Sequence, residues 1–365
     1  PFKRRSGGFA TRQFLNLAEF RRLDHRMHNK AMVVDNRVAI VGGRNLADEY
    51  FGLHAEANFR DLEVIVGGPV AQSIADEFDS YWNDRWSFPI EMLSHVEASP
   101  ADLAAARQVR DENLHVHEEE STVERQARWL EIAAQAHDGR ATLFADEPPR
   151  KAPELATDAP VQVANALVDM FDAADDEIVI VSAYLIPTPA LEGAVERAVQ
   201  RGVRIRMLTN SIRSNNHLTA HSAYRNHIRS LLEAGAEMHE VRIDARDRDI
   251  YMLSPVSEKE LMLHSKTLLI DEDKAFIGSA NLDPRSLRVN TEMGLLIESP
   301  ALNAELRAAI DPDFEPANAW QLQMDEQGDI DWVSDTQVLE EQPAASTMQR
   351  IEDWFFAHLP IEDEL

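Results

Sequence analysis

The stretch His28-Asn29-Lys30-Ala31-Met32-Val33-Val34-Asp35 has a second copy in this chain, at His264-Ser265-Lys266-Thr267-Leu268-Leu269-Ile270-Asp271. Both copies read H-x-K-x4-D, and each continues into a glycine-containing segment that ends at Asn45 or Asn281. Every matched position of the second copy follows its counterpart by 236 residues. An acidic residue, Asp61 or Glu292, then precedes a proline by eight residues. A constant offset over several positions indicates a duplicated unit with half a site in each copy.

Each copy is predicted to be a β-hairpin. Residues two apart in a strand share a face, so His and Lys project together. The Asp follows the His by seven positions, an odd step that turns it away. This favours a structural role for Asp35 and Asp271 in the turn that follows. The apolar runs at 38–41 and 275–277 are predicted to be the returning strands.

Two imidazoles, two ammoniums and two amides together suit a phosphodiester substrate. A neutral His can attack phosphorus and form a phosphohistidine, while a protonated His donates to the departing alkoxide. The lysines and asparagines would stabilise charge on the non-bridging oxygens. Asp61 and Glu292 are each expected to bind a His Nδ1–H and fix its tautomer. No metal and no cofactor is expected, because the cationic side chains already supply the charge.

The surrounding sequence carries a family resemblance. The relevant stretches are RMHNKAMVVDNRVAIVGGRNLADEYFG (26–52), VSAYLIPT (181–188), LTNSIRSNNHLTAHSAYR (208–225), LHSKTLLIDEDKAFIGSANLDPRSLRVNTEMGLLIES (263–299) and AWQLQMDEQGDIDWV (319–333). The two H-x-K-x4-D motifs resemble those of the phospholipase D superfamily. Together with these stretches they resemble the bacterial cardiolipin synthases of the C type, over most of the chain and most weakly between residues 90 and 160.

The resemblance implies an α/β fold of two phospholipase D-type domains related by a pseudo-twofold axis, with one active site between them. It implies transfer of a phosphatidyl group through phosphohistidine to phosphatidylglycerol. The implied catalytic residues are His28, Lys30, Asp35, His264, Lys266 and Asp271, with Asn45 and Asn281 as phosphate ligands. His28 is the expected nucleophile, by resemblance and because Arg44 adds a cation to the first half-site only.

Three further residues are candidates for lipid binding: Tyr184, His221 and Tyr224. Tyr184 lies at the end of a predicted strand, where open α/β sheets bind ligands. The resemblance implies that His221 and Tyr224, after the next predicted strand, lie near the lipid. Capping and loop hydrogen bonds are the alternative role for all three.

The chain is expected to divide into four parts. Residues 1–90 hold a remnant of the first domain, 91–160 a variable connector, 161–310 the second domain, and 311–365 a tail packing on the body. The second repeat has strands and helices ahead of its His, whereas only 27 residues precede His28. The first domain is therefore expected to be truncated, which keeps a non-catalytic fragment among the alternatives.

Composition limits the partners. The net charge is −28, which makes a nucleic-acid backbone a poor partner. High-salt adaptation and an acidic proteome both account for such acidity. No stretch is long and apolar enough for a membrane-spanning helix. The expected setting is peripheral contact with the bacterial cytoplasmic membrane. The expected substrates are phosphatidylglycerol and, as a second donor, phosphatidylethanolamine. A superfamily phosphodiesterase or nuclease and a phosphatidylserine synthase remain alternatives.

Overall fold

The computed structural model describes residues 25–54, 56–93, 99–113, 121–149, 161–247 and 260–359. Its strands are β1 (Ala31–Val34), β2 (Val38–Gly42), β3 (Ala57–Arg60), β4 (Glu63–Gly67), β5 (Arg140–Ala145), β6 (Glu177–Ser182), β7 (Arg204–Asn210), β8 (Glu237–Val241), β9 (Glu260–Leu263), β10 (Lys266–Ile270), β11 (Lys274–Gly278), β12 (Met293–Glu298), β13 (Ala319–Met324), β14 (Ile330–Val333) and β15 (Val338–Leu339). Its helices are η1 (Asp48–Tyr50), α3 (Pro69–Trp82), α4 (Ile90–Leu93), α5 (Pro100–Asn113), α6 (Thr122–Ala134), α7 (Gln162–Ala173), α8 (Pro189–Gln200), α9 (Leu218–Arg225), α10 (Ile228–Ala234), α11 (Pro284–Arg288), α12 (Pro300–Ile310), η5 (Asp311–Phe314) and α13 (Thr347–Ala357).

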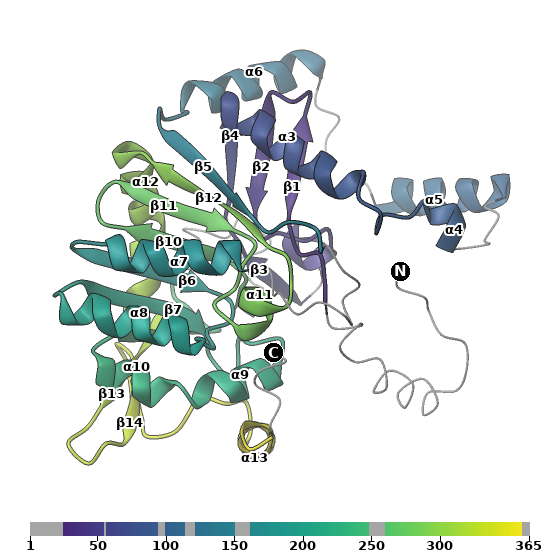
Figure 1. Cartoon of the computed structure of the whole chain (residues 1–365). Coiled ribbons are helices and arrows are strands. Elements are labelled where there is room, and N and C mark those ends of the chain that lie inside the picture. Colours follow the sequence, from purple (N-terminus) through teal and green to yellow (C-terminus); the bar gives the residue numbers. More distant parts are fainter. Residues whose placement is uncertain are drawn as a thin grey trace.

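The second repeat is built on a ten-stranded mixed sheet in the order β15-β14-β13-β8-β7-β6-β10-β11-β12-β5 (Figure 1). β6, β7 and β8 run parallel, and β10 joins β6 antiparallel. The strand β6 is buried on both faces, as its continuous apolar run predicts. Helices α7, α8 and α10 pack on one face, while α12 and η5 cover the other. This is the expected α/β architecture.

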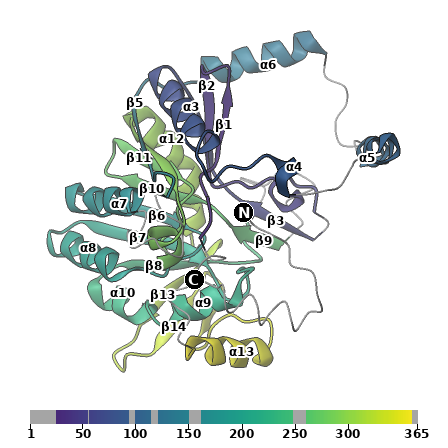
Figure 2. The same cartoon turned by 45° about the vertical axis from the view of Figure 1, so that its right-hand side comes forward.

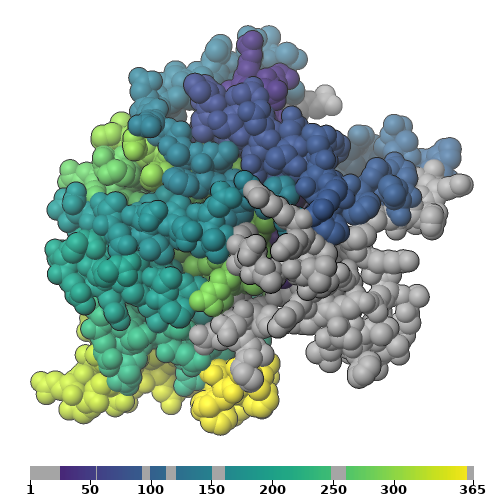
Figure 3. Space-filling model, viewed as in Figure 1, coloured from purple at the N-terminus to yellow at the C-terminus, as the bar shows by residue number. Residues whose placement is uncertain are grey.

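The predicted hairpins are confirmed. β1 pairs with β2, and β10 pairs with β11, both antiparallel and in equivalent registers. In the first repeat β4 completes a three-stranded sheet, and α3 packs against it. Ala39 and Val41 of β2 share a buried cluster with Met293, Leu295 and Ile297 of β12, so the two repeats join through their hairpin sheets. Figure 3 shows the blue first repeat lying directly against the teal and green second repeat.

Within the described residues, the first-repeat sheet has three strands and is smaller than the ten-stranded sheet of the second repeat. In the second repeat β10 lies between β6 and β11, whereas within the described residues β1 has β2 as its one partner strand. Met32 and Val34 of β1 are accordingly exposed at 61% and 44%.

The expected connector and tail take a larger part in the fold than their sequences indicated. β5, within the connector, forms an edge of the large sheet beside β12. At the opposite edge the tail adds β13, β14 and β15, and α13 packs against α9 (Figure 2). Covering an edge strand pairs backbone groups that would otherwise face solvent. The division at residues 160 and 310 therefore cuts through one continuous sheet.

Candidate active site

The hairpins bring the repeated His and Lys residues to one region. Lys266 is the first residue of β10, and His264 lies two residues earlier. Lys30 and His28 lie at the matching place just before β1. The charge of Lys30 acts on both Lys266 and His264, so the two half-sites meet in a single electrostatic environment.

Backbone pairing crosses between the repeats at this point. β3 runs parallel to β9, and the amide of His264 donates to Arg60 O at 2.8 Å. Likewise Met27 bridges Thr291 in parallel, and the amide of His28 donates to Thr291 O at 2.9 Å. Each histidine therefore lies beside the segment that leads into the acidic residue of the other repeat.

Each imidazole is consequently held by a carboxylate from the opposite repeat. The Nδ1 atom of His28 lies 2.9 and 2.8 Å from the two carboxylate oxygens of Glu292. The Nδ1 atom of His264 lies 2.7 Å from Asp61 Oδ2. With a proton on Nδ1, as the third group of a triad arranges, Nε2 of each ring carries no proton. Nε2 of His264 lies 3.3 Å from Lys266 Nζ. Sequence predicted the two acids; the structure pairs each with the other repeat's histidine.

The two histidines differ in their surroundings. The side chain of His264 is 8% exposed and that of His28 is 26% exposed. The His264 ring meets Tyr50 edge-on at 5.0 Å and Phe59 at 5.4 Å between centroids. Burial, together with the nearby Lys266 ammonium, lowers the pKa of His264 to about 4 against the pull of Asp61. His264 is therefore neutral at neutral pH in the ligand-free protein.

The two repeated lysines differ in exposure, because Lys266 is buried and Lys30 is half-buried. Nζ of Lys30 donates to the carbonyl of His28 at 2.8 Å, and Nζ of Lys266 donates to that of His264 at 2.6 Å. Burial lowers the pKa of Lys30 to about 7 and that of Lys266 to about 8, although Asp61 and Glu292 oppose the change. An anionic ligand would favour the charged forms of both.

The repeated asparagines lie in different settings. Asn45 is exposed, and its Nδ2 donates to Tyr50 Oη at 2.9 Å. Asn281 is buried, and within the described residues its Oδ1 has no hydrogen-bond partner. Both remain candidate phosphate ligands.

The position two residues before each asparagine makes the half-sites chemically unequal. Ser279 Oγ donates to Glu292 Oε2, and the amide of Met293 donates to that hydroxyl at 3.0 Å. The counterpart of Ser279 is Gly43, where an added Cβ would lie 2.8 Å from Asp61 Oδ1. Among the described residues, Glu292 therefore has a hydroxyl donor and Asp61 has none.

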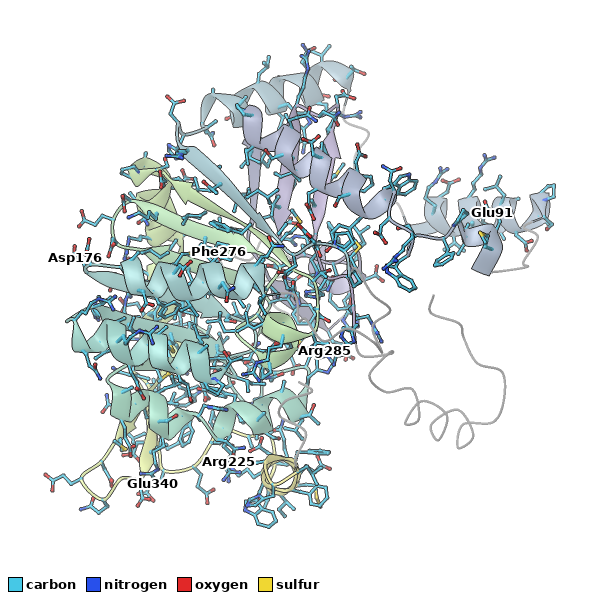
Figure 4. All side chains as sticks on the ribbon, viewed as in Figure 1. Glu91, Asp176, Arg225, Phe276, Arg285 and Glu340 are labelled. Carbon is cyan, nitrogen blue, oxygen red and sulfur yellow. The ribbon has the colours of Figure 1, made fainter. Side chains whose placement is uncertain are left out.

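Asp35 and Asp271 do not join this cluster. Their positions contradict the expectation that they belong to the catalytic residues. They occupy the hairpin turns at φ 52° and 50°, at the strand ends remote from the lysines. The Asp271 carboxylate accepts backbone N–H bonds from residues 175–177, including one of 2.8 Å from Asp176. Figure 4 shows Asp176 at the opposite end of the domain from Arg285, which belongs to α11. Their positions agree with the structural role that the odd spacing favours.

The three candidate lipid-binding residues separate. Tyr184 is partly exposed, and its Oη donates to Asn216 Oδ1 at 2.8 Å. His221 and Tyr224 are buried in the domain core, which corrects their expected contact with lipid. His221 Nδ1 pairs with Asp353 Oδ1 of α13 at 2.8 Å. Helix α13 of the tail therefore occupies the place beside His221 where a lipid was expected.

Sequence analysis also missed residues that shape the site. Tyr50 and Phe59 form the aromatic wall of His264, with their rings stacked at 4.8 Å. Asp146 is buried beside Glu292. Tyr50, Phe59 and Asp146 have no counterpart in the other repeat, and duplication was the signal that singled out the other site residues.

Within the described residues, no cluster of three His, Cys, Asp or Glu side chains is arranged to hold a metal ion. None of the described helices is long and apolar enough to cross a membrane.

A paired arrangement of two hairpins with H-x-K motifs defines the phospholipase D class of α/β proteins. The chain matches the family described as cardiolipin synthase, phospholipase D-like domain, over residues 5–82 and 167–314. It belongs to that family.

The chain is 34% identical to cardiolipin synthase C of Escherichia coli (strain K12) over 369 residues, covering 95% of this chain and 74% of that protein. It is 28% identical to an uncharacterized protein of Helicobacter pylori (strain ATCC 700392 / 26695), covering 88% of this chain and 63% of the relative. The crystal structure of phosphatidylserine synthase from Haemophilus influenzae Rd KW20 superimposes with a TM-score of 0.55 at 14% identity. That superposition covers 81% of this chain and 63% of the other, and it supports the fold.

Proposed function

We propose that the chain is a phospholipase D-type phosphatidyltransferase that forms cardiolipin from phosphatidylglycerol. Membership of the cardiolipin synthase family supports phospholipid transfer. The observation that carries the proposal is the site itself. Two imidazoles are oriented by carboxylates of opposite repeats, and the buried Lys266 and the half-buried Lys30 lie beside them.

The proposed reaction has two displacements. In the first, Nε2 of one neutral histidine attacks the phosphorus of a donor phospholipid and forms an N–P bond. The P–O bond to the headgroup alcohol breaks, and the second histidine gives that oxygen its proton. In the second displacement, the histidine that gave up its proton takes one from a phosphatidylglycerol hydroxyl. The hydroxyl oxygen then attacks phosphorus, and the N–P bond breaks.

The cationic and amide groups have the task of holding phosphate charge. Lys30 and Lys266 would bind the non-bridging oxygens, with Asn45 and Asn281 as further donors. Such donors act more strongly in a site that excludes water. The side chain of Lys266 is buried at 2% exposure, which fits this requirement.

Two orders of attack are open to the diad. Family resemblance favours His28 as nucleophile. The electrostatic argument for His28 does not hold, because Arg44 Nε pairs with Glu63 Oε2 at 2.9 Å and its charge is not directed to His28. In the ligand-free structure the neutral, enclosed His264 has the protonation state that a nucleophile needs. This observation favours the reverse order.

The proposed setting is the surface of the bacterial cytoplasmic membrane, with peripheral contact. Phosphatidylglycerol is the proposed donor and acceptor, and phosphatidylethanolamine is a second possible donor. A nucleic-acid substrate is disfavoured by the net charge of −28.

The test is conversion of phosphatidylglycerol vesicles, with cardiolipin measured by mass spectrometry for the wild-type protein and for His28→Ala and His264→Ala. Loss of the general acid typically costs 10²–10⁴-fold, and loss of the nucleophile should cost more. Phosphatidylethanolamine as donor and serine as acceptor are tested in parallel. EDTA should leave the rate unchanged. Near wild-type turnover by either variant, with its fold intact, would reject a shared site.

A labelled donor decides the order of attack. If His28 is the nucleophile, labelled phosphatidyl donor marks the His264→Asn protein at His28 and leaves the His28→Asn protein unmarked. The opposite pattern assigns the attack to His264. Absence of label from both variants would replace the covalent mechanism by direct displacement.

A further inference from the structure

We propose that Asp146 is a positioning residue that fixes Glu292 and, through it, the imidazole of His28. This inference rests on the proposed function for its kinetic consequence, whereas its geometric content stands alone. Asp146 lies just after β5, outside both repeats, and is 1% exposed.

Asp146 holds Glu292 through both of its backbone hydrogen-bonding groups. Its amide donates to Glu292 O at 2.9 Å, and its Oδ2 accepts the amide of Glu292 at 3.0 Å. Glu292 lies just before β12, where a register shift would move its carboxylate away from His28. This pair of hydrogen bonds therefore acts on the residue whose side chain orients the imidazole.

The same carboxylate ties Glu292 to a helix. Its Oδ1 accepts the amides of Gln162 at 2.9 Å and Val163 at 3.3 Å, which are the first two residues of α7. The N-cap residue of α7, Val161, makes no side-chain cap hydrogen bond, so Asp146 supplies the missing acceptor. The carbonyl of Asp146 also accepts Tyr81 Oη of α3 at 2.5 Å. One residue thus joins α3, α7 and the Glu292 segment.

The chemistry of the three amide donors requires an acceptor at both oxygens. An asparagine at this position would turn an NH2 group toward one of the N–H donors, and an unmet buried donor costs about 1–3 kcal/mol. Burial raises the pKa of Asp146, and the charge of Glu292 acts in the same direction. The backbone N–H bonds and the positive end of α7 oppose that rise and favour the carboxylate.

The consequence is a chain of contacts to the reacting group. Asp146 fixes the backbone of Glu292, Ser279 donates to its carboxylate, and that carboxylate holds Nδ1 of His28. Misplacing a catalytic group by about 1 Å can cost 10²-fold in rate. We therefore expect Asp146→Asn to lower kcat by about 10–100-fold with a smaller change in KM.

The experiment compares Asp146→Asn and Asp146→Ala with Ser299→Ala. Ser299 is also buried, caps α12 by accepting the Leu302 amide, and donates to Asp138 O. It lies at the far end of the same β5–β12 pair, so it matches the loss of a cap without reaching the site. Asp146→Asn is nearly isosteric and serves if the alanine variant fails to fold.

Two readouts separate positioning from general stability. Nitrogen-15 NMR of the imidazoles reports the hydrogen-bonded Nδ1 proton of His28, assigned by its absence from the His28→Asn spectrum. It should be lost or averaged in Asp146→Asn and retained in Ser299→Ala. In the kinetic cycle, Asp146→Asn should cost little further activity once Glu292→Gln is present.

An unchanged His28 resonance in Asp146→Asn, or additive losses in the double variant, would overturn the proposal. If wild-type protein makes no cardiolipin from phosphatidylglycerol vesicles, the proposed function fails. The NMR comparison, which needs no substrate, still decides whether Asp146 positions His28.

Discussion

Phosphate binding and burial favour opposite protonation states of the Nζ atoms of Lys30 and Lys266. Binding phosphate requires the ammonium form, whereas burial lowers the pKa of Lys30 to about 7 and that of Lys266 to about 8. Since the unfolded lysines titrate near 10.5, the unfolded chain binds more protons than the folded one above about pH 7. These two residues therefore make the free energy of unfolding rise with pH between about 7 and 10.5.

Activity should depend on pH in the opposite sense. As pH rises through about 7 to 8, both lysines lose their charge in the free enzyme and phosphate binding weakens. We expect kcat/KM to fall across this range, because its pH dependence reports groups of the free enzyme. The measurement is a pH–rate profile with phosphatidylglycerol vesicles. Lys274→Met, at the strand end remote from the site, should show the wild-type profile. A flat profile up to pH 10 would contradict the requirement for charged lysines.

Gly43 is a second residue whose size matters. A Cβ there would lie 2.8 Å from Asp61 Oδ1 and 3.1 Å from Lys266 Cδ, so the carboxylate that holds His264 must move. We expect Gly43→Ala to lower kcat on the order of 10²-fold. Gly67→Ala is the matched control, because its nearest neighbour is 3.7 Å away. Thermal unfolding of both variants separates misplacement from unfolding, and full activity of Gly43→Ala would show that the site adapts.

At the scale of elements, each motif strand has two ends with different tasks. Lys266 begins β10 at the site, and Asp271 follows its last residue at the opposite end. There Asp271 closes the hairpin turn and accepts the amides that connect α7 to β6. The spacing between Lys and Asp in H-x-K-x4-D therefore corresponds to the length of the motif strand.

Asp271→Ala should cost stability more than catalysis. Loss of an acceptor for several amides is expected to lower the free energy of unfolding by about 1–3 kcal/mol. Asp35→Ala provides the control, because its φ of 52° matches the 50° of Asp271 and imposes the same backbone strain. The carboxylate of Asp35 has no hydrogen-bond partner within the described part of the chain. Urea unfolding and turnover of the two variants measure the difference. A turnover loss comparable with His264→Ala would restore Asp271 to the catalytic group.

At the scale of the whole molecule, the site depends on both repeats at once. Each histidine is held by the other repeat's acid, so neither repeat alone contains both a histidine and the carboxylate that orients it. The surrounding molecule carries a net charge of −28, and like charges at this density repel one another.

Added salt should therefore stabilise the folded chain. Raising ionic strength from about 0.1 M to 1 M shortens the Debye length from about 10 Å to about 3 Å and screens the repulsion. We expect the midpoint of thermal unfolding in NaCl to rise over this range. Sucrose at equal osmolality is the control for a general excluded-solute effect. A constant or falling midpoint would mean that the surface acids are not a net source of repulsion, and would favour the proteome-wide account of the acidity.

The sequence by itself determined the hairpins, the paired His and Lys, and the acids at matched positions. These follow from alternation along a strand and from a duplication whose offset is 236 residues in the motifs and 231 at the acids, and both signals are local or internal to the sequence. It also indicated a structural role for Asp271, because an odd spacing turns a residue away from its neighbours.

Only the tertiary structure decided which acid serves which histidine. It also placed β5 in the second sheet, buried His221 against Asp353 of α13, and set Asp146 beside Glu292. Each of these depends on which distant segments pair or pack, and that choice is made by burial and by the pairing of backbone groups across the whole fold. Residues of this kind have no repeated context and no local periodicity, so no pattern along the chain distinguishes them.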